Sequence, residues 1–175
     1  REENETSREL STPSHYAYLK ISEGCNWLCG YCAIPLIRGR HTSVPMEKLV
    51  AEAEALVKKG VREIMVIAQD TTYYGVDLYG ERKIAELLER LCRIEKLEWI
   101  RLHYAYPTDF PDQLIEVMAR ERKICRYLDI PFQHISIRAW IAVLIVITWI
   151  NQLFGMNFLY GYLQRICPML FHLLK

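Results

Sequence analysis

The sequence lacks several features that would place it in a common class of protein. Its 22 basic and 21 acidic residues leave a net charge of +1, so no strong positive field indicates nucleic-acid binding by charge alone. The opening residues, REENETSREL, are charged and lack the apolar stretch of a secretory signal. We therefore expect a cytoplasmic protein. In that reducing compartment, closely spaced cysteines more often bind a metal or serve redox chemistry than form disulfides.

Charge is almost missing from the end of the chain, where only Arg165 and Lys175 follow Arg138. Residues 139–164 are uncharged and long enough to cross a bilayer of ~30 Å as a helix. One interpretation is a membrane segment, and the other is a sequence that has replaced the true continuation, for instance by a shifted reading frame. The expected regions are an N-terminal extension, a truncated core and an atypical hydrophobic tail, at residues 1–16, 17–136 and 137–175.

Apolar runs and helical periodicity alternate along the rest of the chain. Four runs predict strands, at residues 17–22, 63–70, 99–107 and 127–134. Apolar residues at helical spacing predict helices over residues 44–60, 82–94 and 109–120. The last of these helices has Asp109 as its expected N-cap. Strand-helix units in succession predict parallel strands joined by right-handed crossovers.

A glycine-rich phosphate-binding loop is also missing after the first predicted strand, which counts against a nucleotide-binding doubly wound fold. A barrel of strand-helix units satisfies the same alternation, and in both folds function collects where the strands end. Cysteines follow the first strand, and Gln69 and Asp70 close the second. We predict an α/β fold, a partial (β/α) barrel of about four strand-helix units followed by an apolar helical tail.

The cysteines after the first strand, Cys25, Cys29 and Cys32, lie within eight positions. Three thiolates from one short loop can hold three corners of an iron-sulfur cluster and leave the fourth iron open to a ligand. A zinc ion with His41 as the fourth ligand is an alternative, although structural zinc sites usually draw ligand pairs from separated segments. A redox pair of Cys29 and Cys32 would leave Cys25 unused, and cysteines that only pack in the core would bind no metal.

The stretch CNWLCGYC has the CxxxCxxC spacing of the radical S-adenosylmethionine (SAM) enzymes, with the aromatic Tyr31 before its last cysteine. Residues 11–136 further resemble the methylthiotransferases that modify an aspartate of ribosomal protein uS12. The segments that carry this resemblance are HYAYLKISEGC, CAIPLIRGRH, IAQDTTYYGVDLYG, WIRLHYAYP and YLDIPFQHIS. The transfer-RNA methylthiotransferases share the cysteine motif and are the alternative within the family.

The resemblance implies a radical SAM barrel and a radical reaction. A 4Fe-4S cluster on Cys25, Cys29 and Cys32 would bind SAM, whose cleavage yields a radical that takes a hydrogen from the β-carbon of the target aspartate, before a methylthio group is added. Tyr31 would lie near the adenine, and Gln69 and Asp70 near the methionyl amine. For Asp70, a structural role as a turn or N-cap residue is the alternative.

The resemblance also implies partners, namely uS12 or the small ribosomal subunit and an electron donor. The family has an N-terminal domain with a second cluster and a C-terminal β-barrel domain, and neither is recognised in this sequence, which has no cysteine before Cys25. We therefore expect an enzyme fragment that cannot complete methylthiolation alone. A metal-binding or membrane-tethered remnant without activity is the alternative.

Overall fold

The computed structural model describes residues 12–27, 29 and 32–130. By its internal contacts the chain divides into two units, Arg1–Cys125 with Asp129–Pro131, and Arg126–Leu128 with Phe132–Lys175. The architecture below is that of the first unit.

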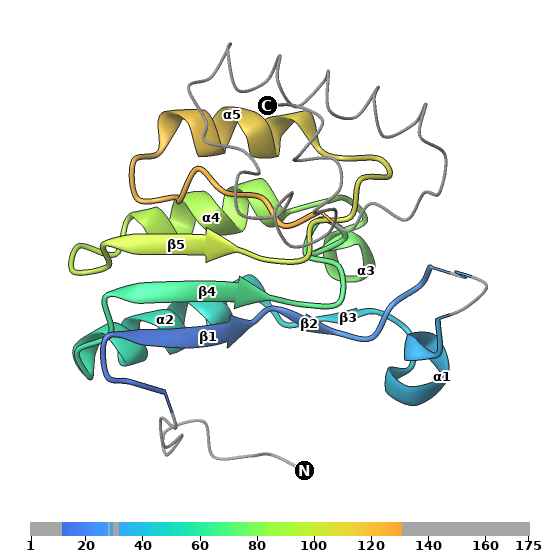
Figure 1. Cartoon of the computed structure of the whole chain (residues 1–175), viewed down its shortest axis with the longest axis horizontal. Coiled ribbons are helices and arrows are strands. Elements are labelled where there is room, and N and C mark those ends of the chain that lie inside the picture. Colours follow the sequence, from blue (N-terminus) through green and yellow to red (C-terminus); the bar gives the residue numbers. More distant parts are fainter. Residues whose placement is uncertain (1–11, 28, 30–31, 131–175) are drawn as a thin grey trace, which may run out of the picture. The chain divides into compact units, whose positions relative to one another are not determined.

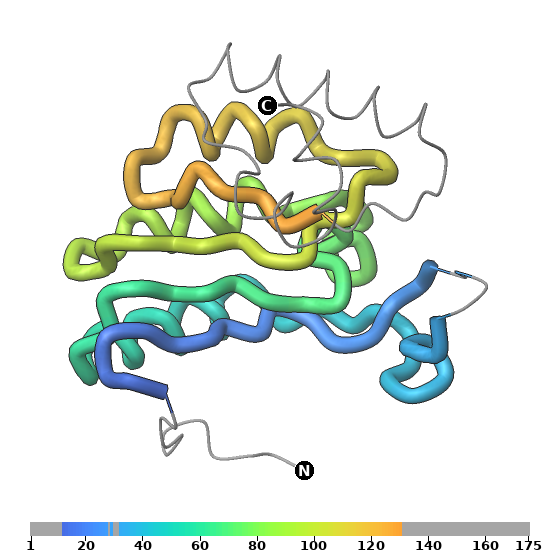
Figure 2. Tube along the Cα trace, in the orientation of Figure 1, coloured from blue at the N-terminus to red at the C-terminus, as the bar shows by residue number. Residues whose placement is uncertain are grey.

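Three parallel strands form the centre of this unit, β1 (Tyr16–Lys20), β4 (Glu63–Ile67) and β5 (Trp99–Leu102), in the spatial order β1-β4-β5 (Figure 1). Buried residues line up across the sheet. One row holds Ala17, Ile64 and Ile100, and the next holds Leu19, Val66 and Leu102. Because side chains alternate along a strand, all of these residues point to one face. Figure 2 follows the chain through the strands in sequence order.

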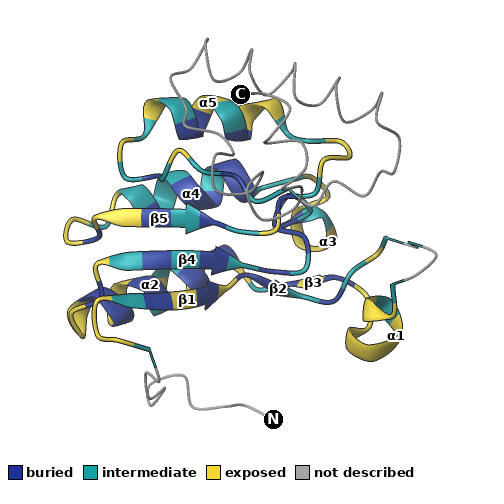
Figure 3. Ribbon diagram, in the orientation of Figure 1, coloured by how far each residue is buried: buried dark blue, intermediate teal, exposed yellow. Residues whose placement is uncertain are grey.

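Helices α2 (Met46–Lys58), α4 (Ile84–Cys92) and α5 (Asp112–Arg120) connect or follow the strands. Helix α2 contacts β1 and α4, and α4 contacts α5, so the helices form one continuous layer. The apolar side of each helix is buried, as the dark blue stripes of Figure 3 show. Sequential strand order with successive helices in contact is the arrangement of a (β/α) barrel, whereas a doubly wound sheet has helices on both faces.

Four short elements were not predicted. Strand β2 (Ser22–Glu23) pairs antiparallel with β3 (Thr42–Ser43), and the short helices are α1 (Ile34–Arg38) and α3 (Val76–Tyr79). The pairing of β2 with β3 ties the start of the cysteine loop to the segment that follows α1. The start and the end of the cysteine loop are therefore both held near the edge of the sheet where the parallel strands end.

Two predictions about chain segments were wrong. Residues 127–130, the described part of the predicted fourth strand, form no strand; the parallel contact with β5 comes earlier, as a bridge between the buried Ile124 and Ile100. Asp109 does not cap α5, which begins after Pro111; Asp109 has a φ of 50° and lies in the preceding turn. The physical reason is that the residue before a proline avoids helical angles, so the helix starts only after Pro111.

In the part of the chain that the structure describes, no helix is both long enough and apolar enough to span a membrane. The candidate segment at 139–164, the tail at 137–175 and Tyr31 all lie outside the described residues.

Candidate active site at the ends of the parallel strands

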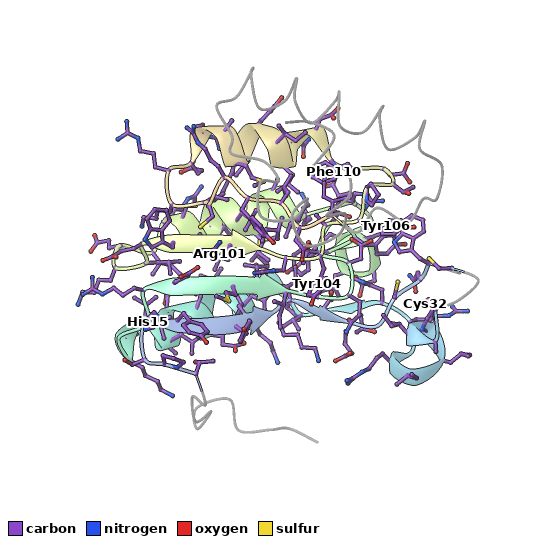
Figure 4. All side chains as sticks on the ribbon, viewed as in Figure 1. His15, Cys32, Arg101, Tyr104, Tyr106 and Phe110 are labelled. Carbon is purple, nitrogen blue, oxygen red and sulfur yellow. The ribbon has the colours of Figure 1, made fainter. Side chains whose placement is uncertain are left out.

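The three parallel strands end at the same edge of the sheet, and the loops that follow them meet there. The cysteine loop follows β1 and β2, residues 68–75 follow β4, and residues 103–107 follow β5. In Figure 4, Cys32 and Tyr106 lie at this end of the sheet, whereas His15 lies at the opposite end. The prediction that the cysteines lie where a strand ends is therefore confirmed.

The start of the cysteine loop is fixed by close backbone contacts. Gly24 has a φ of 80°, and a Cβ on it would come 2.3 Å from the carbonyl oxygen of Arg40, so only glycine fits. The Cys25 N–H donates to the Gly39 carbonyl (3.2 Å). Burial raises the pKa of the Cys25 thiol, although the Trp27 N–H, 3.4 Å from its sulfur, acts in the opposite direction.

Asp70 anchors the loop after β4. Its side chain is fully buried, and its Oδ1 accepts hydrogen bonds from the N–H (2.9 Å) and the hydroxyl (2.6 Å) of Thr72, which is the geometry of an Asx turn. The next residue, Thr71, donates its hydroxyl to the His103 carbonyl (3.0 Å) and its N–H to the Tyr104 carbonyl (3.1 Å). The loops after β4 and β5 are thus joined by hydrogen bonds from the buried Thr71.

Trp27, a residue that the sequence did not single out, joins the cysteine loop to both other loops. Its Nε1–H donates to Oδ2 of Asp70 (2.7 Å), and its ring stacks on Tyr106, with 4.8 Å between ring centroids. Tyr106 in turn places its hydroxyl 3.9 Å from the Cys29 sulfur. A tryptophan between two of the predicted ligand cysteines, together with aromatic residues after a later strand, was the available signal.

His41 lies in a separate buried cluster. Ser43 donates its hydroxyl to Oδ1 of Asp77 (2.6 Å) and accepts the Gly75 N–H (3.0 Å), so its oxygen also accepts a hydrogen bond from the Nε2–H of His41 (3.1 Å). Nε2 of the imidazole therefore carries a proton, and the ring packs edge-on against Tyr73. Burial lowers the pKa of His41, more than the carboxylates of Asp77 and Asp70 raise it.

Among the described residues, no group of three or more His, Cys, Asp or Glu side chains converges in the manner of a metal site. Within that described part of the chain, neither the three cysteines alone nor the cysteines together with His41 form a converged site, so this geometry does not decide between zinc and a cluster. His41 is instead hydrogen-bonded through Nε2 to Ser43. The three thiols are each half-buried and come from one loop, and thiolates are the ligands of iron-sulfur clusters. The chemistry of this ligand set fits such a cluster.

Two buried polar atoms near the same edge also fit a ligand. The side-chain amide of Gln69 donates a hydrogen bond through Nε2 to the Glu23 carboxylate (3.2 Å). The Oε1 of Gln69 takes no part in this bond and can act as an acceptor. Within residues 12–27, 29 and 32–130, neither this Oε1 nor the buried hydroxyl of Ser22 has a hydrogen-bond partner. Buried polar groups are normally satisfied, so these two atoms can accept or donate a hydrogen bond to water or to a polar ligand at this edge.

Comparison with known families assigns this arrangement to a class. The family described as the Radical SAM superfamily matches residues 19–150, and the chain belongs to that superfamily. The α/β fold of the radical SAM type is confirmed, and the cofactors of the superfamily, a 4Fe-4S cluster and SAM, are those that we expected. Which side chains hold them stays a prediction.

The curated relatives are more specific. Over 129 residues the chain is 63% identical to the ribosomal protein uS12 methylthiotransferase RimO of Flavobacterium johnsoniae, a match that covers 74% of this chain and 30% of the relative. The enzyme of the same name from Christiangramia forsetii is 62% identical over 129 residues, covering 74% and 29% of the two chains. The chain thus spans about 30% of the length of these relatives.

Solved structures agree on the fold. The radical SAM methyltransferase TsrM of Kitasatospora setae, solved with tryptophan and a SAM analogue, superposes with a TM-score of 0.60 at 14% identity, covering 87% of this chain and 33% of TsrM. A second TsrM structure, with cobalamin and a [4Fe-4S] cluster, gives 0.53 at 18% identity, covering 69% of this chain and 23% of TsrM.

Proposed function

We propose that the chain is the radical SAM core of a methylthiotransferase that modifies an aspartate of ribosomal protein uS12. The observation that carries the proposal is that the cysteine loop, held by Trp27 against Asp70 and Tyr106, lies where the parallel strands end. The high identity to relatives that carry this name supports the substrate. Partners would be uS12 or the small ribosomal subunit and an electron donor, and the compartment would be the cytoplasm.

In this proposal Cys25, Cys29 and Cys32 hold a 4Fe-4S cluster, which when bound supplies the electron that cleaves SAM. Gln69 contributes its buried Oε1 as an acceptor, which suits an ammonium group such as the methionyl amine of SAM. Asp70 has a structural role in the site, because its carboxylate already accepts three hydrogen bonds from Trp27 and Thr72.

Anaerobic reconstitution with iron and sulfide, followed by SAM and dithionite, tests the proposal. We expect iron and sulfide in equal amounts and formation of 5′-deoxyadenosine. Cys25→Ala should abolish both, whereas the matched control Cys92→Ala should not, because Cys92 lies at the end of α4 with its pKa raised to about 11 by burial. Zinc in place of iron, or a product that survives Cys25→Ala, would contradict the proposal.

The same preparation tests the extent of the activity. We expect no methylthio-aspartate in uS12 from this chain alone, because the chain spans about 30% of the length of its relatives. Mass spectrometry of uS12 after incubation with the reconstituted chain checks this, and a mass increase of one methylthio group would overturn it.

A further inference from the structure

The contact between Tyr106 and Cys29 joins a residue of the loop after β5 to a predicted cluster ligand. The Tyr106 hydroxyl lies 3.9 Å from the Cys29 sulfur, within the reach of a hydrogen bond to sulfur. The two residues are 77 positions apart in sequence, so the contact exists only because parallel strands bring their ends to one edge.

The chemistry of the pair fixes which atom donates. A cysteine that binds iron does so as a thiolate, which has no proton to give. A tyrosine hydroxyl carries a proton that it can donate, so Tyr106 is the donor. Once Cys29 is a ligand, the contact is a hydrogen bond from Tyr106 to a cluster sulfur.

The tyrosine is held in place independently of this contact. Its ring stacks on Trp27, whose Nε1–H is fixed by Asp70 at 2.7 Å. Its backbone carbonyl lies 3.4 Å from the hydroxyl oxygen of Thr72, whose proton is donated to Asp70. Ring and backbone are therefore positioned by two different loops, and the direction of the hydroxyl follows from them.

We propose that Tyr106 is a positioning residue whose hydroxyl donates to the Cys29 sulfur and raises the reduction potential of the cluster. The inference rests on the proposed function and extends it to the control of electron transfer. Reduction adds negative charge to a cluster, and a hydrogen bond to one of its sulfurs stabilises the more negative state. Removing the bond should therefore make the cluster harder to reduce.

The test compares the whole 175-residue chain with Y106F, which loses only the hydroxyl and keeps the stacked ring. Both are loaded with iron and sulfide, and the reduced cluster is followed by electron paramagnetic resonance during a mediated redox titration. At a fixed potential we expect the ratio of reduced to oxidised cluster to fall about tenfold in Y106F, which corresponds to about 59 mV for one electron. The matched control is Y104F, because Tyr104 lies in the same loop with half of its surface exposed.

The outcomes separate the two proposals. Equal midpoint potentials in fully loaded wild type and Y106F would overturn the role of Tyr106 and leave the proposed function standing, as would a shift of the same size in Y104F. A wild-type chain that binds no cluster would overturn both. If Y106F alone fails to bind the cluster, a ring-fluorinated tyrosine at position 106 is used instead, because it keeps the ring and is a stronger hydrogen-bond donor. The reduction potential of the cluster should then rise. An unchanged potential would refute the inference.

Discussion

The loop after β4 and the cysteine loop lie at the same edge of the sheet but are built in opposite ways. In the loop after β4, Asp70, Thr71 and Thr72 are completely buried, and their polar side chains hydrogen-bond within the loop and to the loop after β5. In the cysteine loop the three thiols are half-buried. The side chain that ties this loop to the other two is Trp27.

The difference separates two tasks within one site. The buried and hydrogen-bonded side chains of Asp70, Thr71 and Thr72 make this part of the loop after β4 a rigid platform, since breaking any one bond leaves a group unsatisfied. The cysteine loop carries ligands whose arrangement a metal cluster would complete, because metal binding and local ordering are linked. Residues at the fixed points of each loop should therefore respond differently to substitution.

The largest effect is expected at Gly24, the fixed point at the start of the cysteine loop. Gly24→Ala forces a Cβ to within 2.3 Å of the Arg40 carbonyl at a φ of 80°. We expect a loss of about 3 kcal/mol in the free energy of unfolding, together with poor cluster loading. Gly80 is the matched control: its φ of 75° and ψ of 0° lie in the left-handed region, but a Cβ there meets nothing within 4 Å, so Gly80→Ala should cost only about 1–2 kcal/mol. Urea unfolding checks both variants, and equal costs would mean that the contact with Arg40 is not tight.

A smaller effect is expected in the platform. Asp70→Asn places an amide where the carboxylate accepts from both Trp27 and Thr72, so one donor faces another. We expect about 2 kcal/mol of destabilisation in urea unfolding. Asp109→Asn is the control, because the Asp109 side chain is 77% exposed and lies 3.8 Å from Arg82; it should change stability by less than about 0.5 kcal/mol. A tolerated Asp70→Asn would show that the platform is not rigid.

The link between the two loops can be measured by itself. Trp27→Phe keeps an aromatic ring beside Tyr106 but removes the donor to Asp70. In a double-mutant cycle with Asp70→Asn we expect a coupling energy of about 1 kcal/mol in the free energy of unfolding. A cycle that closes at zero would indicate that Trp27 packs against the platform without a hydrogen bond that matters. In that case Trp27 would not couple the stability of the cysteine loop to that of the loop after β4.

The sequence predicted the local part of this architecture well. Helices α2 and α4 follow from apolar spacing within one segment, and each was placed to within a few residues of its observed bounds. Strand β4 was expected to reach Asp70 but ends at Ile67. An apolar run shows that a segment is buried, but it does not show where the hydrogen-bonded ladder stops, and here the chain turns to bury Asp70.

The candidate site was predicted only in part, because its geometry depends on contacts between distant segments. The cysteine spacing is local, and it identified Cys25, Cys29 and Cys32 as one set. The bond from Trp27 to Asp70 spans 43 positions, and no local pattern encodes it. The short pairing of β2 with β3 was missed for the same reason, since strands of two residues carry no periodicity.

A further effect concerns pH and the buried cluster of His41, Ser43 and Asp77 beside the cysteine loop. The side chain of Asn26 accepts the backbone N–H of His41 at 3.0 Å, which attaches the backbone at this histidine to the cysteine loop. The folded pKa of His41 is lowered from 6.5, chiefly by burial, and a proton on its Nδ1 would find no acceptor among the described residues. The unfolded chain then binds more protons between the two pKa values, so stability falls as the pH drops below about 6.5.

Urea unfolding measured from pH 7 to pH 5 checks this dependence. For the single proton of His41, the slope should reach at most about 1.4 kcal/mol per pH unit and should disappear in His41→Gln. The exposed His15 is the control, and His15→Gln should keep the wild-type slope. Asp77 does not interfere in this range: burial alone would raise its pKa, but hydrogen bonds from Ser43 lower it below 3.8, so its contribution is lost only at more acidic pH. A slope that persists in His41→Gln would show that a group other than His41 carries the titration.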